Sequence, residues 1–488
     1  MFYANIFKAA PVMAVLMCGT AAQALTADQV WADWQALATG VGVKVTSATE
    51  VKGDGELTLN GVTIAPADGK GGATISEVTL VEEEDGSVTI YPAEIKVDVA
   101  PPAGETGKLD ITHEGLGISV HEDAGGLGYG LFADTLNVVA QGSGTETFDV
   151  SVAFEALDGR YTRDAAALLL QAAADRMTYS IAQKNELVDS KQTNDTETLD
   201  LAAELSLPEG LDLMSLQTPQ AFFAAARNGL GLRAEINQGA GKGSLSDQNP
   251  MMPMNLTFSA EPSTTGIEVN KDVFAFDTTV GKVGIQVLPP MVPAASDISM
   301  DGLSTGLSMP VVATEAGEYG YSLKMTNLVM GDGIWGLFDP MAALPREPAN
   351  VDLDLGGTMK IDMLDLMEAS ETGTPPKSVP ELQTLDIRAL GLSVAGAALS
   401  GTGAFTFDNA LVAAGGPPMP IGTADLRLEG GNKLIEGLIA IGVLKEEDAM
   451  GARMMMAMFG KPAGDDVLTS KVEAREGGSI FVNGQQIQ

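Results

Sequence analysis

Apolar and polar residues alternate with a period of two along most of this chain. Leu57 and Leu59 stand between polar neighbours, as do Ile95 and Val97, and the longest such run extends over 351–363. Successive side chains of a β-strand face opposite sides of the sheet, so an alternating segment predicts a strand with one dry face and one wet face. The pattern therefore predicts a chain built mostly from half-buried strands.

Glycine and asparagine mark the expected turns between these strands. Asn60-Gly61 and Asn483-Gly484 each stand between two alternating segments. Both residue types tolerate the positive φ angles that tight hairpins require. The spacing predicts a succession of antiparallel hairpins, with a closing hairpin over 478–487.

A few segments change to the helical period of 3.6 residues. Thr26 followed by Gln29 forms a capping box, and apolar residues recur behind it at helical spacing. A second helix is expected over 218–229, and two more over 432–444 and 450–459. Helices are thus expected near the start, the middle and the end of the chain.

One segment gives conflicting signals. Residues 165–174 are rich in Ala, Leu and Gln, which favour helices. Met177, Tyr179 and Ile181 alternate directly afterwards and predict a strand over 175–184. The pattern leaves 165–174 open between helix and strand.

Methionines dominate the last predicted helix. Met450, Met454 and Met458 are four residues apart and form one stripe, with Met455 and Phe459 beside it. The favoured interpretation is a core face that packs against the sheet. The alternative is an adaptable apolar surface, in which Met450, Met454, Met458 and Phe459 contact an apolar ligand or a partner.

The first 24 residues have the features of a cleaved secretory signal. Lys8 precedes the apolar run 9–17, and Ala22-Gln23-Ala24 is a small-x-small exit. We expect cleavage after Ala24, a mature region over 25–488, and a periplasmic or secreted protein without a membrane span. Because the only cysteine is Cys18, the mature chain would have no disulfide or thiolate metal site.

The charge of the chain limits its partners. It has 488 residues, with 28 Lys+Arg against 65 Asp+Glu, which gives a net charge of −37. Nucleic acids and anionic lipids are bound through Lys and Arg, so a surface this acidic disfavours both. Apolar residues make up 45% of the chain and charged residues 19%, which favours a folded protein over a disordered acidic tail.

Motifs for catalysis or metal binding are incomplete. The segments Gly117–His121 and Gly391–Ala395 each lack the second glycine of a G-x-S-x-G nucleophile elbow. His113 and His121 are each followed by Glu, but neither belongs to an H-E-x-x-H motif. The acidic run Glu82–Asp85 is not part of a calcium-binding loop. We therefore expect a non-enzymatic protein with no catalytic residue, cofactor or metal.

Several longer segments resemble a bacterial family. Residues 334–355 and 428–460, the closing FVNGQQI and the opening 25–42 are similar to the bacterial domain-of-unknown-function family numbered 2125, which implies a similarity over most of the mature chain. That family has no assigned activity, so the resemblance implies no site residues. The strand pattern is more loosely similar to AsmA-like envelope proteins, whose curved sheets resemble lipid conduits. This chain differs from their usual plan because it lacks a membrane anchor.

These observations lead to one fold and two candidate functions. We expect a mainly β protein of elongated, curved antiparallel sheets with a few amphipathic helices; if 25–488 divides into two halves, the boundary is expected near 205–235. The first function is an exported envelope protein that shelters an apolar or lipid ligand on the dry sheet face. The alternative is a structural or protein-interaction module, which binds another envelope protein and no ligand. An open apolar cavity would favour the first.

Overall fold

The chain is mainly β, as predicted. A computed structural model describes residues 25–40, 43–66, 71–99, 106–123, 126–144, 146–163, 167–185, 188–208, 219–248, 253–288, 296–412 and 415–487. Strands account for 64% of the structure and helices for 15%. The expected signal segment 1–24, including Cys18, lies outside the described residues. The chain forms two compact units, residues 1–206 with 236–257 and residues 207–235 with 258–488.

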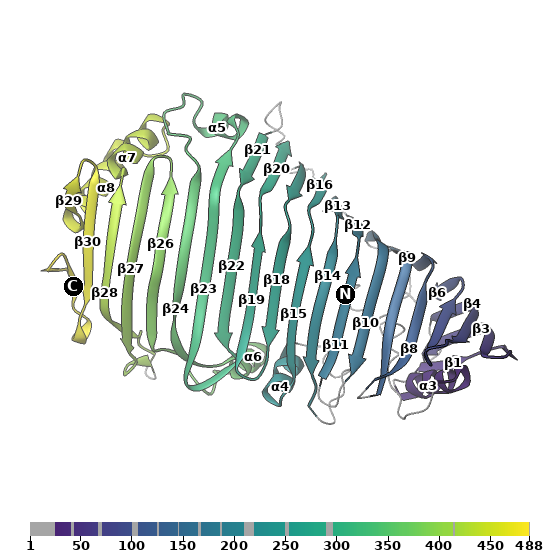
Figure 1. The fold of residues 1–488 in the computed structure, drawn as a ribbon. Helices are drawn as coiled ribbons and strands as arrows, with labels where there is room; N and C mark the ends of the chain where they lie inside the picture. The colour runs from purple at the N-terminus through teal and green to yellow at the C-terminus, as the bar shows by residue number, and fades with distance from the viewer. Residues whose placement is uncertain are drawn as a thin grey trace. The chain divides into compact units, whose positions relative to one another are not determined.

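Unit 1 begins with a helix and continues as strands (Figure 1). The helix is α3 (Ala27–Gly40). The strands are β1 (Val43–Thr46), β2 (Thr49–Lys52), β3 (Glu56–Pro66), β4 (Gly72–Glu82), β5 (Val88–Pro92), β6 (Ile95–Asp98), β7 (Thr106–Glu114), β8 (Gly117–Asp123), β9 (Gly126–Ser143), β10 (Thr147–Arg163), β11 (Ala167–Ala174), β12 (Arg176–Lys184), β13 (Asp189–Thr196), β14 (Leu199–Ser206) and β16 (Gly241–Asp247).

Six of these strands form four neighbouring rows of one antiparallel sheet. β5 and β6 pair in the same register with the two halves of β4, and the Ser76 and Ala93 backbone N–H groups donate to the Glu94 and Glu77 carbonyls between them, so β5 and β6 follow one edge of β4. β8 and β7 pair in the same way with the two halves of β9. β5 pairs with β8 and β6 with β7, which joins the two middle rows. We call the six strands from β4 to β9 the β4–β9 sheet.

Helix α3 forms as its capping box predicts. The Thr26 backbone N–H donates to Gln29 Oε1 at 3.0 Å, and the Gln29 N–H donates to Thr26 Oγ1 at 3.3 Å. Trp31 and Trp34 of this helix are 5% and 7% exposed and belong to the same hydrophobic core as the buried residues of β3 and β4. The helix therefore packs on the strands with its apolar stripe.

The turn expected at Asn60-Gly61 is wrong. Strand β3 continues through both residues. The pairing with β4 keeps one register from Asn60–Glu77 to Val62–Ile75, and Gly61 between them has a φ of 59°. Gly61 therefore supplies a positive φ within a continuous strand, whereas the sequence pattern assigned it to a turn.

In the segment left open at 165–174, residues 167–174 form a strand, and 165–166 lie outside the described residues. β11 pairs with β10 from Arg163–Leu168 to Asp158–Ala173, and with β14 on its other side. Its Ala and Leu residues favour helix only weakly, and pairing on both sides outweighs that preference. The strand expected over 175–184 is present as β12.

Unit 2 contains the remaining helices and most of the longer strands (Figure 1). The helices are α4 (Pro219–Arg227), α5 (Asp332–Phe338), α6 (Met363–Thr372), α7 (Gly431–Ala440) and α8 (Glu446–Phe459), with a short 3₁₀ turn at Glu476–Gly478. The strands are β18 (Ser263–Val269), β19 (Val273–Val280), β20 (Val283–Leu288), β21 (Ser296–Met300), β22 (Gly302–Pro310), β23 (Val312–Met330), β24 (Ala349–Asp362), β25 (Glu381–Leu382), β26 (Thr384–Val394), β27 (Ala397–Asp408), β28 (Met419–Glu429), β29 (Lys461–Gly464), β30 (Val467–Ala474), β31 (Ile480–Val482) and β32 (Gln485–Gln486). The unit changes at three points along the chain, which are after Ser206 at the end of β14, inside β15 (Gly231–Gln238) and inside β17 (Met254–Ala260).

Several predicted elements of unit 2 are confirmed. Strand β24 covers the long alternating run, and α4, α7 and α8 match the predicted helices. The closing hairpin is formed by β31 and β32. Helix α5 and helix α6 were not predicted, because α5 is only seven residues long and α6 interrupts an alternating pattern. No helix in the described part of the chain is long and apolar enough to cross a membrane.

Candidate functional site

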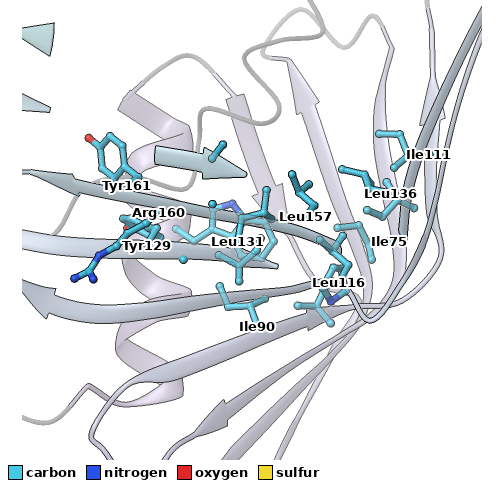
Figure 2. A pocket seen from close by; sticks show the side chains of 18 of the residues that line it. Ile75, Ile90, Ile111, Leu116, Tyr129, Leu131, Leu136, Leu157, Arg160 and Tyr161 are labelled. Carbon is cyan, nitrogen blue, oxygen red and sulfur yellow. The ribbon is translucent and has the colours of Figure 1, made fainter. Parts of the chain in front are cut away.

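An apolar cavity of about 250 Å³ lies inside unit 1 (Figure 2). Its wall comes from α3, from β3, from every strand of the β4–β9 sheet, and from β10 and β11. Most of the wall is aliphatic and includes Ile75, Ile90, Leu116, Leu136 and Leu157. Because the wall consists mainly of residues from α3 and from paired strands, the cavity is part of the fold itself rather than a gap between surface loops.

The cavity contains no charged side chain from the described residues. Arg160 also lines it, but Arg160 pairs with Gly130 of β9, and Gly130 stands between the inward-facing Tyr129 and Leu131. Paired residues share a face of the sheet, so the Arg160 side chain lies on the opposite face. Figure 2 shows its guanidinium directed away from the aliphatic cluster around Leu131. The site is therefore suited to hydrocarbon and not to an anionic group.

Small residues create the empty space. Gly159 of β10 is paired with Leu131 of β9 and with Ala172 of β11, so all three face the cavity. A Cβ atom at Gly159 would have its nearest neighbours at 3.6 Å, an ordinary contact distance. A methyl group would therefore fit at Gly159. Because glycine has none, this position leaves space for a ligand.

Aromatic residues form one side of the cavity. The Tyr129 and Tyr161 rings are 6.0 Å apart and belong to paired positions of β9 and β10. Trp34 lines this cavity and also a second gap of about 10 Å³, roughly the space of one water. Asp33 borders the smaller gap, and partial burial raises the pKa of its carboxyl. The fluorescence of Trp34 should therefore respond to a ligand that enters the cavity.

The two histidines have packing roles in the sheet. His113 Nε2 lies 2.9 Å from the carbonyl oxygen of Ala93, in the short link between β5 and β6. His121 Nε2 is buried without a hydrogen-bond partner, and it lies where a Cβ atom of Gly128 would be. Among the described residues, no group of three or more acidic, His or Cys side chains could hold a metal ion.

The core interpretation of the methionine helix is wrong. Met450, Met454 and Met458 of α8 are 68%, 62% and 55% exposed. The helix instead packs through Ala449, which is fully buried, and through the half-buried Phe459, whose carbonyl accepts a hydrogen bond from Asn483 at 2.8 Å. The periodicity predicted the position of the helix correctly. The helix has two apolar sides, and the side that carries Ala449 packs inward.

The sequence did not locate the cavity. Alternation identified the inward residues of each strand, such as Leu57 and Ile95, without showing which strands pair. The small residues Gly159 and Ala172 were the available signal. They become informative only when they are placed in one row across β10 and β11.

Comparisons with known proteins cover only the later part of the chain. Residues 294–480 match the model of a family described as an uncharacterized protein conserved in bacteria (DUF2125). The match is narrower than the expected similarity over most of the mature chain, and the looser similarity to AsmA-like proteins is not shown. No curated protein and no solved structure matches the chain. The chain is thus similar to this uncharacterized bacterial family over 294–480, a range that contains α5, α7 and α8 and lies outside the cavity.

Proposed function

We propose that the chain is an exported, non-enzymatic envelope protein that shelters a hydrocarbon chain of a lipid in the cavity of unit 1. The observation that carries this proposal is an unfilled space of about 250 Å³ lined by aliphatic side chains of the β4–β9 sheet and its neighbours. An engineered cavity of about 150 Å³ with a similar apolar wall stays dry and takes up apolar molecules. A larger apolar cavity inside a water-soluble fold is accordingly a binding site for hydrocarbon.

The free energy available is sufficient for useful binding. Each methylene removed from water contributes about 0.8 kcal/mol. Eight methylenes would contribute about 6 kcal/mol before the cost of association, and the rest of a longer chain could add to it. Because no charged side chain of the described residues points into the cavity, the favoured ligand is one whose polar group stays outside it.

The export part of the proposal rests on residues 1–24, where Lys8, the apolar run and Ala22-Gln23-Ala24 follow one another as in a secretory signal. Amino-terminal sequencing of the purified protein tests it, and Leu25 is the expected first residue. A protein that retains Met1 would contradict export through a cleaved signal.

Binding can be tested with a fluorescent polyene fatty acid and its alcohol. The chain contains three tryptophans, and only Trp34 lines the cavity. We expect energy transfer from tryptophan to the probe, and its reduction in Trp34→Phe. Native mass spectrometry of the protein from its own host should show a copurifying lipid. No uptake of either probe together with no copurifying lipid would favour the interaction module instead.

A further inference from the structure

Helices α5, α7 and α8 form a cap at one end of the strands of unit 2 (Figure 1). The inner side of the cap is a small core of Trp335, Leu344 and Ala395, with Leu434 and Leu438 of α7 packed against it. Leu344 reaches α7 at Gly437, where a Cβ atom would be only 2.4 Å from it, and α7 also contacts α8. The three helices are therefore one packed element.

A buried carboxylate holds the segment between α5 and β24. Asp339 is fully buried and accepts hydrogen bonds from the Ala343 and Leu344 backbone N–H groups at 2.8 and 3.0 Å. Burial raises its pKa, but these hydrogen bonds and the charge of Arg346 outweigh that effect, so the pKa of Asp339 lies below its usual value. The ionised Asp339 thus orders the part of the cap that carries Leu344.

The outer side of the cap is apolar and exposed. Nine large apolar side chains in the described part of the chain are more than half exposed, and seven of them lie on the cap. We define the cap surface as these seven residues together with the neighbouring Phe338: Leu337, Phe338, Met341, Val443, Met450, Met454, Met455 and Met458. A group of exposed apolar side chains of this kind usually marks an interaction surface.

Carboxylates border the cap surface. Glu446, Glu447 and Asp448 are exposed in the first turn of α8, directly before Met450. The nearby Arg453 is occupied, because it forms ion pairs with Glu446 at 3.5 Å and with Glu436 at 3.9 Å. Within the described residues, Glu447 and Asp448 form no ion pair. The methionines and the two unpaired carboxylates thus lie on the same helix.

The charge decides between the possible occupants. A second copy of a chain with a net charge of −37 would be repelled, and so would an anionic bilayer. Helices that lie on membranes carry Lys and Arg beside Trp, Phe or Leu, whereas α8 carries Glu and Asp beside Met. Flexible methionines with flanking carboxylates match a different ligand, an amphipathic helix whose polar side is basic.

We propose that the cap surface binds a cationic amphipathic helix of a partner protein. Met450, Met454 and Met458 form a ridge of residues four apart, the type of ridge that packs against another helix. The α8 helix has 14 residues, so it offers a contact of roughly 21 Å to a partner helix of about four turns. Glu447 and Asp448 then pair with Lys or Arg of the partner at one end of the ridge.

A designed peptide tests this surface in the full-length protein. The probe is a fluorescently labelled 14-residue peptide of Leu and Lys arranged as an amphipathic helix. Its controls are a scrambled Leu/Lys peptide of the same composition and an amphipathic Leu/Glu peptide. By fluorescence anisotropy at 0.15 M and 0.5 M salt, we expect the amphipathic Leu/Lys peptide to bind at least tenfold more tightly than either control.

Matched variants separate the ridge from general charge attraction. Met454→Gln should weaken binding at least tenfold, while Met254→Gln, a 36% exposed methionine outside the cap, should leave it unchanged. Glu447→Gln with Asp448→Asn should reduce both the affinity and its salt dependence. Both sets replace exposed side chains, so the melting temperature should not move.

Five results would overturn the proposal. Equal binding of the scrambled peptide, or no loss in Met454→Gln, would show simple charge attraction. Flotation with phosphatidylcholine vesicles that Met454→Gln abolishes would assign the surface to a membrane. Self-association in sedimentation velocity that the same variant abolishes would assign it to a second copy. If no peptide binds, the cap surface does not bind the proposed type of partner.

Discussion

Filling the cavity should abolish much of the ligand affinity without harming the fold. Ala172 faces the cavity from β11, opposite Gly159 of β10. Ala172→Leu adds three carbons to a space that the fold leaves empty. These carbons would displace about three methylenes of a bound chain, and at about 0.8 kcal/mol each the loss is roughly 2.4 kcal/mol. The dissociation constant should therefore rise about 50-fold.

Gln171→Leu provides a matched control. Gln171 is the preceding residue of the same strand, pairs with Arg160, and is exposed on the other face of the sheet. The variant introduces the same side chain without entering the cavity, so its affinity should equal that of the unmodified protein. The assay is titration with the fluorescent fatty alcohol, followed by energy transfer from Trp34.

The thermal unfolding of both variants completes the comparison. Ala172→Leu should keep or raise the melting temperature, because it fills apolar space. An unchanged affinity in Ala172→Leu at an unchanged melting temperature would refute the assignment of the ligand to this cavity. A similar loss in Gln171→Leu would point to the outer face of β11 instead.

Three further predictions follow from the same structure. Arg160→Gln should leave the affinities for a fatty acid and its alcohol within about twofold of each other, because the Arg160 side chain lies on the outer face; a selective loss of acid binding, measured by titration, would contradict this. Met454→Ala should change the free energy of unfolding in urea by less than about 0.5 kcal/mol, since Met454 is 62% exposed, whereas Leu344→Ala in the cap core should cost about 2 to 5 kcal/mol. Asp339 has a lowered pKa in the folded state, so its stabilising effect is complete above its unfolded value of about 3.9 and is lost as the pH falls through the folded value; Asp339→Asn should flatten the acid side of the stability profile, and a profile that keeps its slope would show that other groups control it.

The sequence was sufficient to predict whether most elements are strands or helices. Alternation located the strands because one face of each is drier than the other, and the Thr26 capping box located the start of α3. It misplaced a turn at Gly61, because glycine takes a positive φ within the continuous strand β3 as it would in a hairpin. It could not assign 165–174, because the local preference of Ala and Leu is weaker than pairing with β10 and β14.

The cavity and the cap surface depend on information that the pattern lacks. The cavity requires side chains of α3 and of strands as far apart in the sequence as β3 and β11 to lie around one space, and no local signal encodes that arrangement. On α8, the stripe of Met450 and Met454 was expected to be core. It is exposed because Ala449 allows a closer approach to the underlying structure than methionine would.

The most direct test of the central claim is a crystal structure of the full-length protein with a terminally brominated fatty alcohol. Anomalous scattering locates the bromine without reference to the rest of the ligand. The account predicts a bromine peak inside the cavity, near Leu116, Leu131 and Leu157. A bound alcohol whose bromine lies elsewhere, with the cavity still empty, would contradict it.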